Sequence, residues 1–248
     1  MLNSRLPLRT AGVLALLLIA IPEEVVAQAD YGFRFARIRF GASDERGTGW
    51  GSGWGRGGAM WAHDYPVAEE NFYIALRRTT AIHVEEPYVV LELSDDRIFE
   101  HPVLYLCEPG YWQMEATEVE QLREYLLRGG FILFDDFRGD YEWYNLYEQM
   151  QRVLPGREPQ ELPPSHPIWS IYFDIDPVAA PSLVSGYQGS READRYMGYF
   201  DDDGRLMALA NVNQDIGDGW EYPNRDFENA STVSFQMGIN FVMYALTH

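Results

Sequence analysis

The chain has 248 residues and a formal net charge of −19 at pH 7. Hydrophobic residues make up 46% of it and aromatic residues 15%, which is typical of a globular protein with a sizeable core and excludes an intrinsically disordered one. Such an acidic chain is a poor partner for nucleic acid, because it has no basic patch to displace phosphate counterions. The single cysteine, Cys107, excludes an internal disulfide and any metal site built from several cysteines.

The start of the sequence has the three parts of a secretory signal peptide. Arg5 and Arg9 precede the apolar run AGVLALLLIAI, and the sequence AQA at 27–29 provides a cleavage site. This run is shorter than the roughly 18 apolar residues that a membrane span needs, and no other segment of the sequence approaches that length. We therefore expect residues 1–29 to be a signal peptide, with an uncleaved anchor as the alternative. Residues 30–248 should form a single α/β domain, periplasmic or extracellular, without a membrane span.

The first elements expected after the leader are short strands and one helix. Residues 33–40 (FRFARIRF) alternate in polarity, which predicts a strand with Arg37 and Arg39 on a solvated face. A glycine-rich loop follows, and a helix is predicted from Pro66, because proline is favoured in the first turn. The remaining strands predicted here are residues 81–86 (AIHVEE), 88–93 (YVVLEL) and the uninterrupted apolar run 103–107 (VLYLC).

A second buried strand lies between two predicted amphipathic helices. Thr117 and Glu120 form a T-x-x-E capping box at the start of the first helix, which Gly129 and Gly130 end. Residues 131–134 (FILF) predict a strand that is buried on both faces. The elements predicted after it are a helix over 143–154, a strand over 168–175 (IWSIYFDI), a hairpin of 196–200 and 205–212, and a closing helix over 231–248.

The alternation of buried strands with amphipathic helices predicts the fold class. We expect an α/β fold with a mostly parallel sheet, helices on both faces and a late antiparallel hairpin. In such sheets ligands bind at the carboxyl ends of the strands. Asp135 and Asp136 directly follow the buried run 131–134, so they are expected at this edge.

Seven segments together carry a resemblance to a known family. They are FRFARIRFG, MWAHDYPVAEENF, HPVLYLCEPGYW, LREYLLRGGFILFDDF, LPPSHPIW, NVNQDIGDGWEY and GINFVMYALTH. Their order resembles the bacterial domain-of-unknown-function family 4159 over nearly all of residues 30–248. The resemblance implies a fold of the class I glutamine-amidotransferase-like, flavodoxin-like type and implies no reaction. This chain departs from the family pattern in the long Gly/Trp loop before Trp61 and in having Cys107 where a small polar residue is expected.

Cys107 is the natural candidate for a nucleophile, because the amidotransferase fold uses a cysteine. That chemistry needs a G-x-C-x-G elbow that exposes the sulfur and favours its thiolate. Here Glu108 and Pro109 follow the cysteine, and no H-x-E motif occurs after it to supply the base. The sequence therefore predicts a structural thiol, and the Cys-His-Glu triad is not recognisable.

The candidate site consists of charged residues that follow neighbouring strands. Asp135 and Asp136 should point to opposite faces, because side chains alternate along a strand. One is then expected to face a ligand crevice with Glu108 and His166, while the other caps the next turn or pairs with Arg138. Carboxylates and an imidazole suit a divalent cation or sugar hydroxyls, so these residues are the tentative metal and ligand site. The alternative is that the two aspartates only close a turn.

A second candidate surface lies in the glycine-rich loop. GTGWGSGWGRGG (47–58) lacks the spacing of a phosphate-binding loop, which favours a recognition loop. Trp50 and Trp54, with Trp61 beyond the loop, could stack on a sugar ring or dock on a protein. A carbohydrate-like ligand and a protein partner are therefore both predicted as candidates. The segment 211–221 (NVNQDIGDGWE) is interpreted as a hydrogen-bonded turn, since it lacks the glycine and glutamate of a Ca²⁺ loop.

Two functions remain open on these residues. The first is an exported, non-catalytic module for ligand binding or assembly. The second is a hydrolase acting on a sugar or an amide through a carboxylate–histidine or metal site. The missing elbow and the missing H-x-E favour the first.

Overall fold

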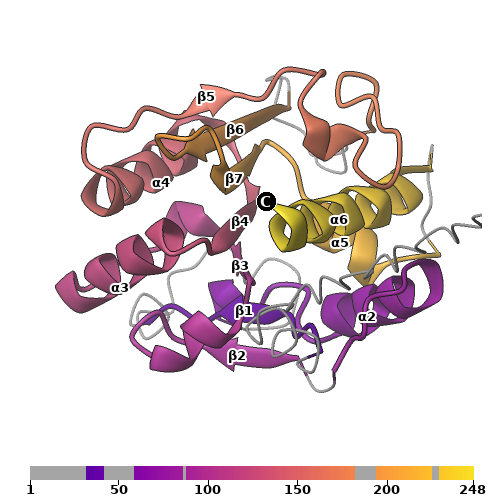
Figure 1. Ribbon diagram of the computed structural model, residues 1–248, viewed down its shortest axis with the longest axis horizontal. Helices are drawn as coiled ribbons and strands as arrows, with labels where there is room; N and C mark the ends of the chain where they lie inside the picture. The colour runs from indigo at the N-terminus through magenta and orange to yellow at the C-terminus, as the bar shows by residue number, and fades with distance from the viewer. Residues whose placement is uncertain (1–31, 42–58, 86–87, 182–193, 225–228) are drawn as a thin grey trace, which may run out of the picture. The chain divides into compact units, whose positions relative to one another are not determined.

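A seven-stranded sheet organises the computed structural model of the chain (Figure 1). The model describes residues 32–41, 59–85, 88–181, 194–224 and 229–248. The predicted signal peptide (1–29) and the glycine-rich loop (47–58) lie outside these ranges. The strands are β1 (Ala36–Ile38), β2 (Val89–Leu91), β3 (Val103–Cys107), β4 (Phe131–Phe137), β5 (Gln160–Glu161), β6 (Arg195–Phe200) and β7 (Leu206–Val212).

The order of the strands across the sheet is β2-β1-β3-β4-β7-β6-β5. The pairs from β2 to β7 in this order are parallel, and β6 pairs antiparallel with both β7 and β5. The mostly parallel sheet and the late antiparallel hairpin are thus confirmed. The five parallel strands follow the order of flavodoxin-like doubly wound folds, in which ligands bind outside the carboxyl ends of the first and third strands.

Helices cover both faces of the sheet, as expected (Figure 1). Helices α3 and α4 bury their apolar sides in one core, while α2, α5 and α6 bury theirs in the other. Each core takes alternate residues of the central strands, which is why those strands are apolar throughout. The helices are α2 (Val67–Thr79), α3 (Ala116–Leu127), α4 (Gly139–Val153), α5 (Ile216–Glu221) and α6 (Ala230–Thr247). Short 3₁₀ turns are η3 (Met60–Ala62), η4 (Asp96–Glu100), η5 (Pro109–Tyr111) and η6 (Pro167–Trp169).

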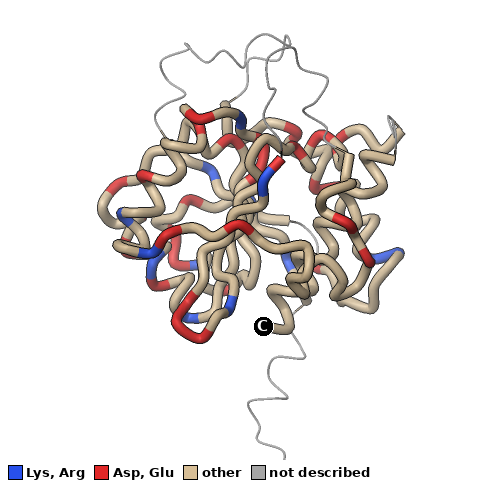
Figure 2. The backbone as a smooth tube through the Cα atoms, turned by 90° about the horizontal axis from the view of Figure 1, so that it is seen from above, with Lys and Arg blue, Asp and Glu red and all other residues tan. Residues whose placement is uncertain are grey.

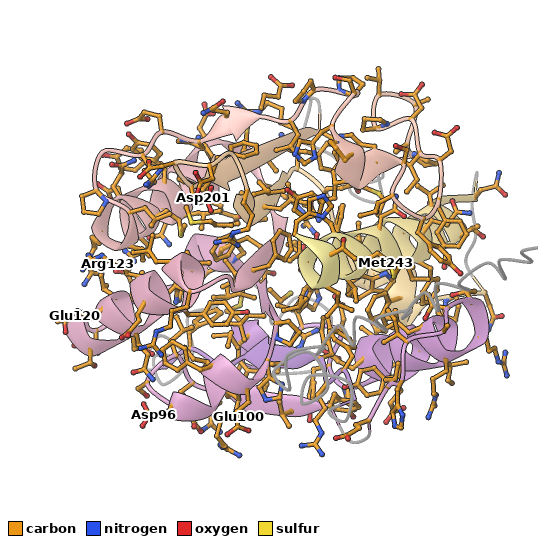
Figure 3. The ribbon with its side chains drawn as sticks, viewed as in Figure 1. Asp96, Glu100, Glu120, Arg123, Asp201 and Met243 are labelled. Atoms are coloured by element: carbon orange, nitrogen blue, oxygen red, sulfur yellow. The ribbon has the colours of Figure 1, made fainter. Side chains whose placement is uncertain are left out.

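The start of α3 differs from the prediction by two residues. The capping box is formed by Glu115 and Glu118, and the backbone N–H of Glu115 donates to Glu118 Oε2 at 2.8 Å. Glu120, predicted as part of the box, is exposed and points away from the sheet (Figure 3). Glutamate can accept at the first position as threonine does, so the sequence pattern alone did not separate the two registers.

The strand predicted over 168–175 is absent from the described structure, where residues 168 and 169 belong to η6 and residues 170–175 form a loop. The backbone N–H of Ile175 donates to the carbonyl of Trp169 at 2.8 Å, so the segment folds back on itself. The side-chain amide of Asn240 in α6 pairs with both backbone groups of Phe173, each at 2.8 Å. A side chain of the closing helix therefore satisfies backbone groups that a neighbouring strand would otherwise bind.

Arg37 also differs from its prediction, because its side chain is fully buried and not solvated. Its Nε forms an ion pair with Glu69 of α2, whose side chain is buried as well. The guanidinium lies 4.8 Å from the ring centre of Tyr105. Arg39 does face solvent, where it pairs with Glu92 at 2.8 Å. The polar alternation of residues 33–40 predicted one solvated face, but α2 covers the side of β1 from which Arg37 projects.

Acidic residues are distributed over many parts of the described chain and are not gathered in one segment (Figure 2). None of the helices in the described residues has the length and apolarity that crossing a bilayer requires.

Candidate functional site

Polar side chains collect at the carboxyl edge of the parallel strands. Cys107 is the last residue of β3, and Glu108 follows it. Asp135 and Asp136 lie near the end of β4. The connection from β1 to α2 brings His63 to the same edge, where its Nδ1 hydrogen-bonds Asp136. The site therefore forms where the strand order reverses between β1 and β3, the place at which doubly wound sheets bind ligands.

A bulge in β4 places Asp135 and Asp136. Phe134 pairs with Ala210 and Phe137 with Val212, so the two aspartates together face one residue of β7. Phe134 and Phe137 consequently point into the same core, although strict alternation would separate them. Asp136 has a left-handed φ of 56°. The expectation that the two carboxylates point to opposite faces is wrong, because the bulge interrupts the alternation.

Asp135 is a fully paired interior carboxylate. The hydroxyl of Tyr105 donates to its Oδ2 at 2.9 Å and the backbone N–H of Gly217 at 3.0 Å. The amide of Asn211 donates to its Oδ1 at 3.0 Å. Burial raises the pKa of Asp135 to about 6, against the opposing effect of these donors. Its bonds join β3, β4, β7 and α5, so Asp135 holds the edge together.

Asp136 connects the positive groups of the site. Its Oδ2 is hydrogen-bonded by His63 Nδ1 and lies 3.8 Å from Cys107 Sγ. Its Oδ1 accepts from Arg138 at 2.8 Å. Burial acts to raise the pKa of Asp136, but the bond and charge of His63 and the charge of Arg138 hold it below its ordinary value. The hydrogen bond to Asp136 in turn raises the pKa of His63 to about 9.

Asp64 is the unusual carboxylate of the site. Its side chain is completely buried, and neither of its oxygens has a hydrogen-bond partner among the described residues. The nearest cation is His63, whose Nε2 lies 3.9 Å from Oδ1. Burial, together with the charges of Asp136 and Asp218, raises the pKa of Asp64 well above its ordinary value. Buried carboxylates normally accept hydrogen bonds, so one whose only described partner is a charge at 3.9 Å requires an explanation.

Arg37 hydrogen-bonds the backbone of the segment that carries His63 and Asp64. One guanidinium nitrogen donates to the carbonyl of Trp61 at 2.9 Å and to that of His63 at 2.8 Å. Asp64 itself has a left-handed φ of 62°. The buried Arg37–Glu69 pair therefore fixes the backbone from which both site side chains project.

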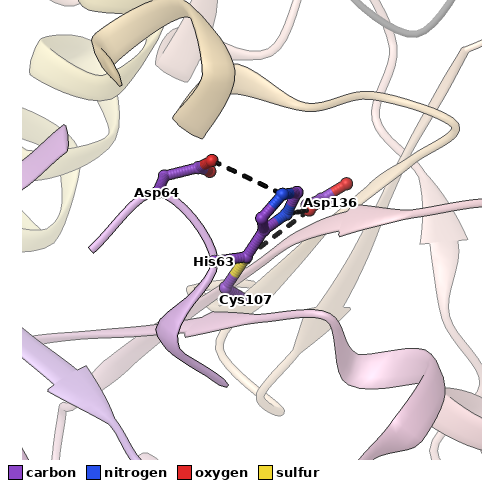
Figure 4. A group of neighbouring side chains, drawn as sticks. All are labelled: His63, Asp64, Cys107 and Asp136. Atoms are coloured by element: carbon purple, nitrogen blue, oxygen red, sulfur yellow. Dashed lines mark hydrogen bonds and ion pairs between the residues drawn. The ribbon is translucent and has the colours of Figure 1, made fainter. Parts of the chain in front are cut away.

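Four side chains come close enough to share one ligand. The potential ligand atoms of His63, Asp64, Cys107 and Asp136, here called the His63 cluster, all lie within 4.8 Å of one another. Figure 4 shows the imidazole between the carboxylates of Asp64 and Asp136. Asp64 also belongs to a neighbouring group with Asp218 and Glu221. Burial and nearby carboxylates raise the pKa of Glu108 and of Asp218, so negative charge is in excess around the cluster.

The structure brings together most of the described residues predicted for the site, with one correction. Glu108 Oε1 lies 3.7 Å from His63 Nδ1, and Arg138 bonds Asp136. His166 is not in this group. It packs on Phe200 and Tyr244, and Phe200 pairs with Leu206 at the start of β7, the amino end of the parallel strands. The chain turns between Pro163 and His166 after β5, so it does not continue to the carboxyl edge.

The predicted tryptophans do not join the cluster in the described structure. Trp61 is partly buried and packs on Tyr65, with ring centres 5.7 Å apart. Trp50 and Trp54 lie outside the described residues.

A depression of about 530 Å³ lies along α4, lined by residues that include Tyr144, Tyr147 and Arg152, and shares no residue with the His63 cluster.

Sequence reasoning missed His63 and Asp64. Both stand in the segment MWAHDYP, and the adjacent His-Asp pair directly before a helix was the available signal. Nothing in the periodicity of the chain shows that this segment reaches the ends of β3 and β4.

A comparison of the sequence with family models finds one match, a domain of unknown function (DUF4159), over residues 34–246. No curated protein matches the chain. The matched range includes all seven strands of the described sheet, its helices up to the penultimate residue of α6, and all four residues of the His63 cluster. The chain therefore belongs to the DUF4159 family, as its motifs indicated.

Proposed function

We propose that this protein is an exported, non-catalytic binding module that takes a positively charged ligand at the His63 cluster. Asp64 carries the proposal. A carboxylate that is buried without a donor is costly for the fold, and a cationic ligand supplies the missing partner. The surrounding excess of carboxylates favours the same kind of ligand.

Export is proposed on the leader sequence at 1–29. Mass spectrometry of the protein secreted by its host tests it, with cleavage after Ala29 expected. An intact Met1 in a soluble cytoplasmic fraction would contradict export. The carbohydrate-like ligand or protein partner suggested by Trp50 and Trp54 stays a prediction, since both residues lie outside the described structure.

Cation binding is tested by thermal unfolding of the purified, chelator-treated protein. A ligand that binds only the folded state stabilises by RT ln(1 + [L]/Kd), about 2.7 kcal/mol at a hundred times Kd. We expect Ca²⁺, Mg²⁺, Zn²⁺ or an organic diamine to raise the melting temperature. Asp136→Asn should remove this rise, while Asp135→Asn should keep it, because Asp135 already has three donors.

His166→Gln serves as the matched control, because His166 lies at the other end of the sheet. If no cation raises the melting temperature of the wild type, the proposal fails. It also fails if Asp136→Asn responds as strongly as the wild type.

A hydrolase is the second candidate, and the contact between His63 and Asp136 favours it. A carboxylate bound to Nδ1 orients a histidine for acid–base chemistry at Nε2. Two observations oppose it: the pKa of His63 is raised to about 9, so the ring is protonated at neutral pH, and Cys107 is fully buried. Turnover of sugar or amide substrates that His63→Gln abolishes would favour the hydrolase over the binding module.

A further inference from the structure

The donor atoms of the His63 cluster match one class of cation. The cluster offers an imidazole nitrogen, a thiol sulfur and two carboxylates, which is the mixed set that zinc accepts in four-coordinate sites. Ligands about 2.0–2.3 Å from a tetrahedral ion lie roughly 3–4 Å from one another. Cys107 Sγ and Asp136 Oδ2 are 3.8 Å apart, and His63 Nε2 and Asp64 Oδ1 are 3.9 Å apart. The spacing already approaches that of a zinc site (Figure 4).

Asp64 provides an observation that is independent of this clustering. Both of its oxygens are buried without a hydrogen-bond donor in the described structure, and they lie beside the other three groups. A Cβ atom on Gly217 would come within 2.5 Å of Asp64 Oδ2, so the neighbouring helix leaves no room for a side chain there. The carboxylate is thus confined next to the cluster without the partner that its burial requires.

The thiol of Cys107 favours Zn²⁺ over Ca²⁺ and Mg²⁺ as the ligand of the cluster. Ca²⁺ and Mg²⁺ prefer oxygen ligands in larger number, whereas sulfur and imidazole favour Zn²⁺. The neighbouring group of Asp64, Asp218 and Glu221 offers only oxygens and is the natural competitor for the harder ions. We infer that His63, Asp64, Cys107 and Asp136 form a Zn²⁺ site. This inference rests on the proposed cation-binding function and names its ligand.

The surroundings of the cluster suit such an ion. Three anionic ligands around a dication leave one negative charge, which Arg138 balances through its 2.8 Å contact with Asp136 Oδ1. The His63 carbonyl is fixed by Arg37 at 2.8 Å, so the ligand has a defined backbone position. The His63 side chain is 45% exposed, which gives an ion a path from solvent to the buried thiol. Cys107 would bind the ion as a thiolate, and because the ion displaces the thiol proton, the ion-free protein needs no exposed, activated thiolate.

Zinc titration and cobalt spectroscopy test the site on untagged, chelator-treated full-length protein. We expect one Zn²⁺ per chain by calorimetry. Co²⁺ in the same site should show a thiolate-to-metal charge-transfer band and tetrahedral d–d absorption. Cys107→Ser should abolish the charge-transfer band, and His63→Gln should weaken Zn²⁺ binding by about tenfold or more. Both substitutions are close in size to the original side chains, and circular dichroism checks that each variant folds.

The controls separate this inference from the proposed function. Glu221→Gln alters only the all-oxygen group, so it should leave the cobalt spectrum unchanged. The zinc site is refuted if Co²⁺ binds without a thiolate band, or if Glu221→Gln abolishes Zn²⁺ binding while Cys107→Ser and His63→Gln do not. Stabilisation by Ca²⁺, Mg²⁺ or a diamine without any Zn²⁺ binding would refute the inference and leave the proposed cation-binding function standing.

Discussion

Two buried carboxylates at the same edge of the sheet, Asp135 and Asp64, are held in opposite ways. Asp135 accepts three hydrogen bonds from Tyr105, Asn211 and Gly217. Asp64 accepts none among the described residues, although its side chain is equally buried and also lies against Gly217. The difference separates a carboxylate that maintains the fold from one whose partner has to come from outside the chain.

The origin of the difference lies in the elements that carry the two residues. Asp135 is part of a central strand, so its neighbours on β3 and β7 are set by the register of the sheet. Asp64 lies in the connection from β1 to α2, which reaches the edge because Arg37 binds its backbone. A connecting segment can be placed over the edge without the donors that a strand provides, which is why binding residues often lie on such segments.

The largest expected effect comes from releasing the segment that carries Asp64. Arg37→Met leaves Glu69 as an unpaired buried charge, which should lower the free energy of unfolding by about 3–5 kcal/mol. It also removes the donors to Trp61 and His63, so any cation response should disappear. Arg39→Met is the matched control, because its pair with Glu92 is half exposed and should be worth no more than about 1 kcal/mol. Urea unfolding of both variants measures this, and equal costs would contradict the role of Arg37.

Crowding the space between the two carboxylates should have a smaller effect. In Gly217→Ala, the new Cβ would approach Asp64 Oδ2 to 2.5 Å and the Tyr105 hydroxyl to 2.8 Å. The resulting displacement should cost about 1–3 kcal/mol and reduce the shift in melting temperature that a cation produces. Gly41→Ala is the control, because no atom of the described residues lies within 4 Å of its Cβ position, and it should change stability by less than about 0.5 kcal/mol. A full cation response in Gly217→Ala would show that Asp64 does not contact the ligand.

Neutralising each carboxylate in turn tests the comparison directly. Asp135→Asn turns an amide N–H₂ towards groups that already donate, which should cost about 1–3 kcal/mol without changing the cation response. Asp64→Asn removes a buried carboxylate that has no hydrogen-bond donor and only a 3.9 Å contact with His63, so in the absence of cations stability should be unchanged or increased. The same variant should lose the cation response. Thermal unfolding with and without cation measures both effects, and a strong loss of stability in cation-free Asp64→Asn would remove the distinction.

The sequence predicts the strands that carry this site, because their apolar runs are a local feature of the chain. Apolar runs such as 103–107 and 131–134 have to be buried on both faces, which makes a parallel sheet with polar residues at its carboxyl ends the natural arrangement. Asp136, Glu108 and Arg138 were therefore placed at the correct edge. His166 lies at the other edge because the chain turns after β5 and the imidazole packs on Tyr244 of α6, a contact far away in the chain.

The residues that sequence reasoning missed depend on contacts across long stretches of chain. Arg37 alternates with apolar neighbours and reads as solvated, since its partner Glu69 is 32 residues away. His63 contacts Asp136 across 73 residues, from a connection without any periodic pattern. The bulge at Asp135 and Asp136 depends on pairing with β7, so their common side could not be read from strand alternation either.

The smallest expected effect concerns His101, a buried side chain that lies away from the His63 cluster. His101 precedes β3 at the amino edge of the sheet, and its Nδ1 has no hydrogen-bond partner among the described residues. Burial lowers the pKa of His101 below the ordinary 6.5. A hydrogen bond to the backbone of Arg34 and the charge of Glu100 oppose this shift, while the charges of Arg34 and Arg97 add to it. The unfolded chain then takes up a proton on this ring at a higher pH than the folded one, so stability is lost as the pH falls through 6.5.

His101→Leu should remove this loss and nothing else. Relative to the wild type, the variant should gain stability between pH 7 and pH 5, by at most about 1.4 kcal/mol per pH unit for one proton. The melting-temperature rise with cations should stay that of the wild type, because His101 has no carboxylate cluster beside it. Urea unfolding at both pH values measures the gain. A pH-independent difference would show that the ring titrates alike in both states, and a lost cation response would show that the cation site is not confined to the His63 cluster.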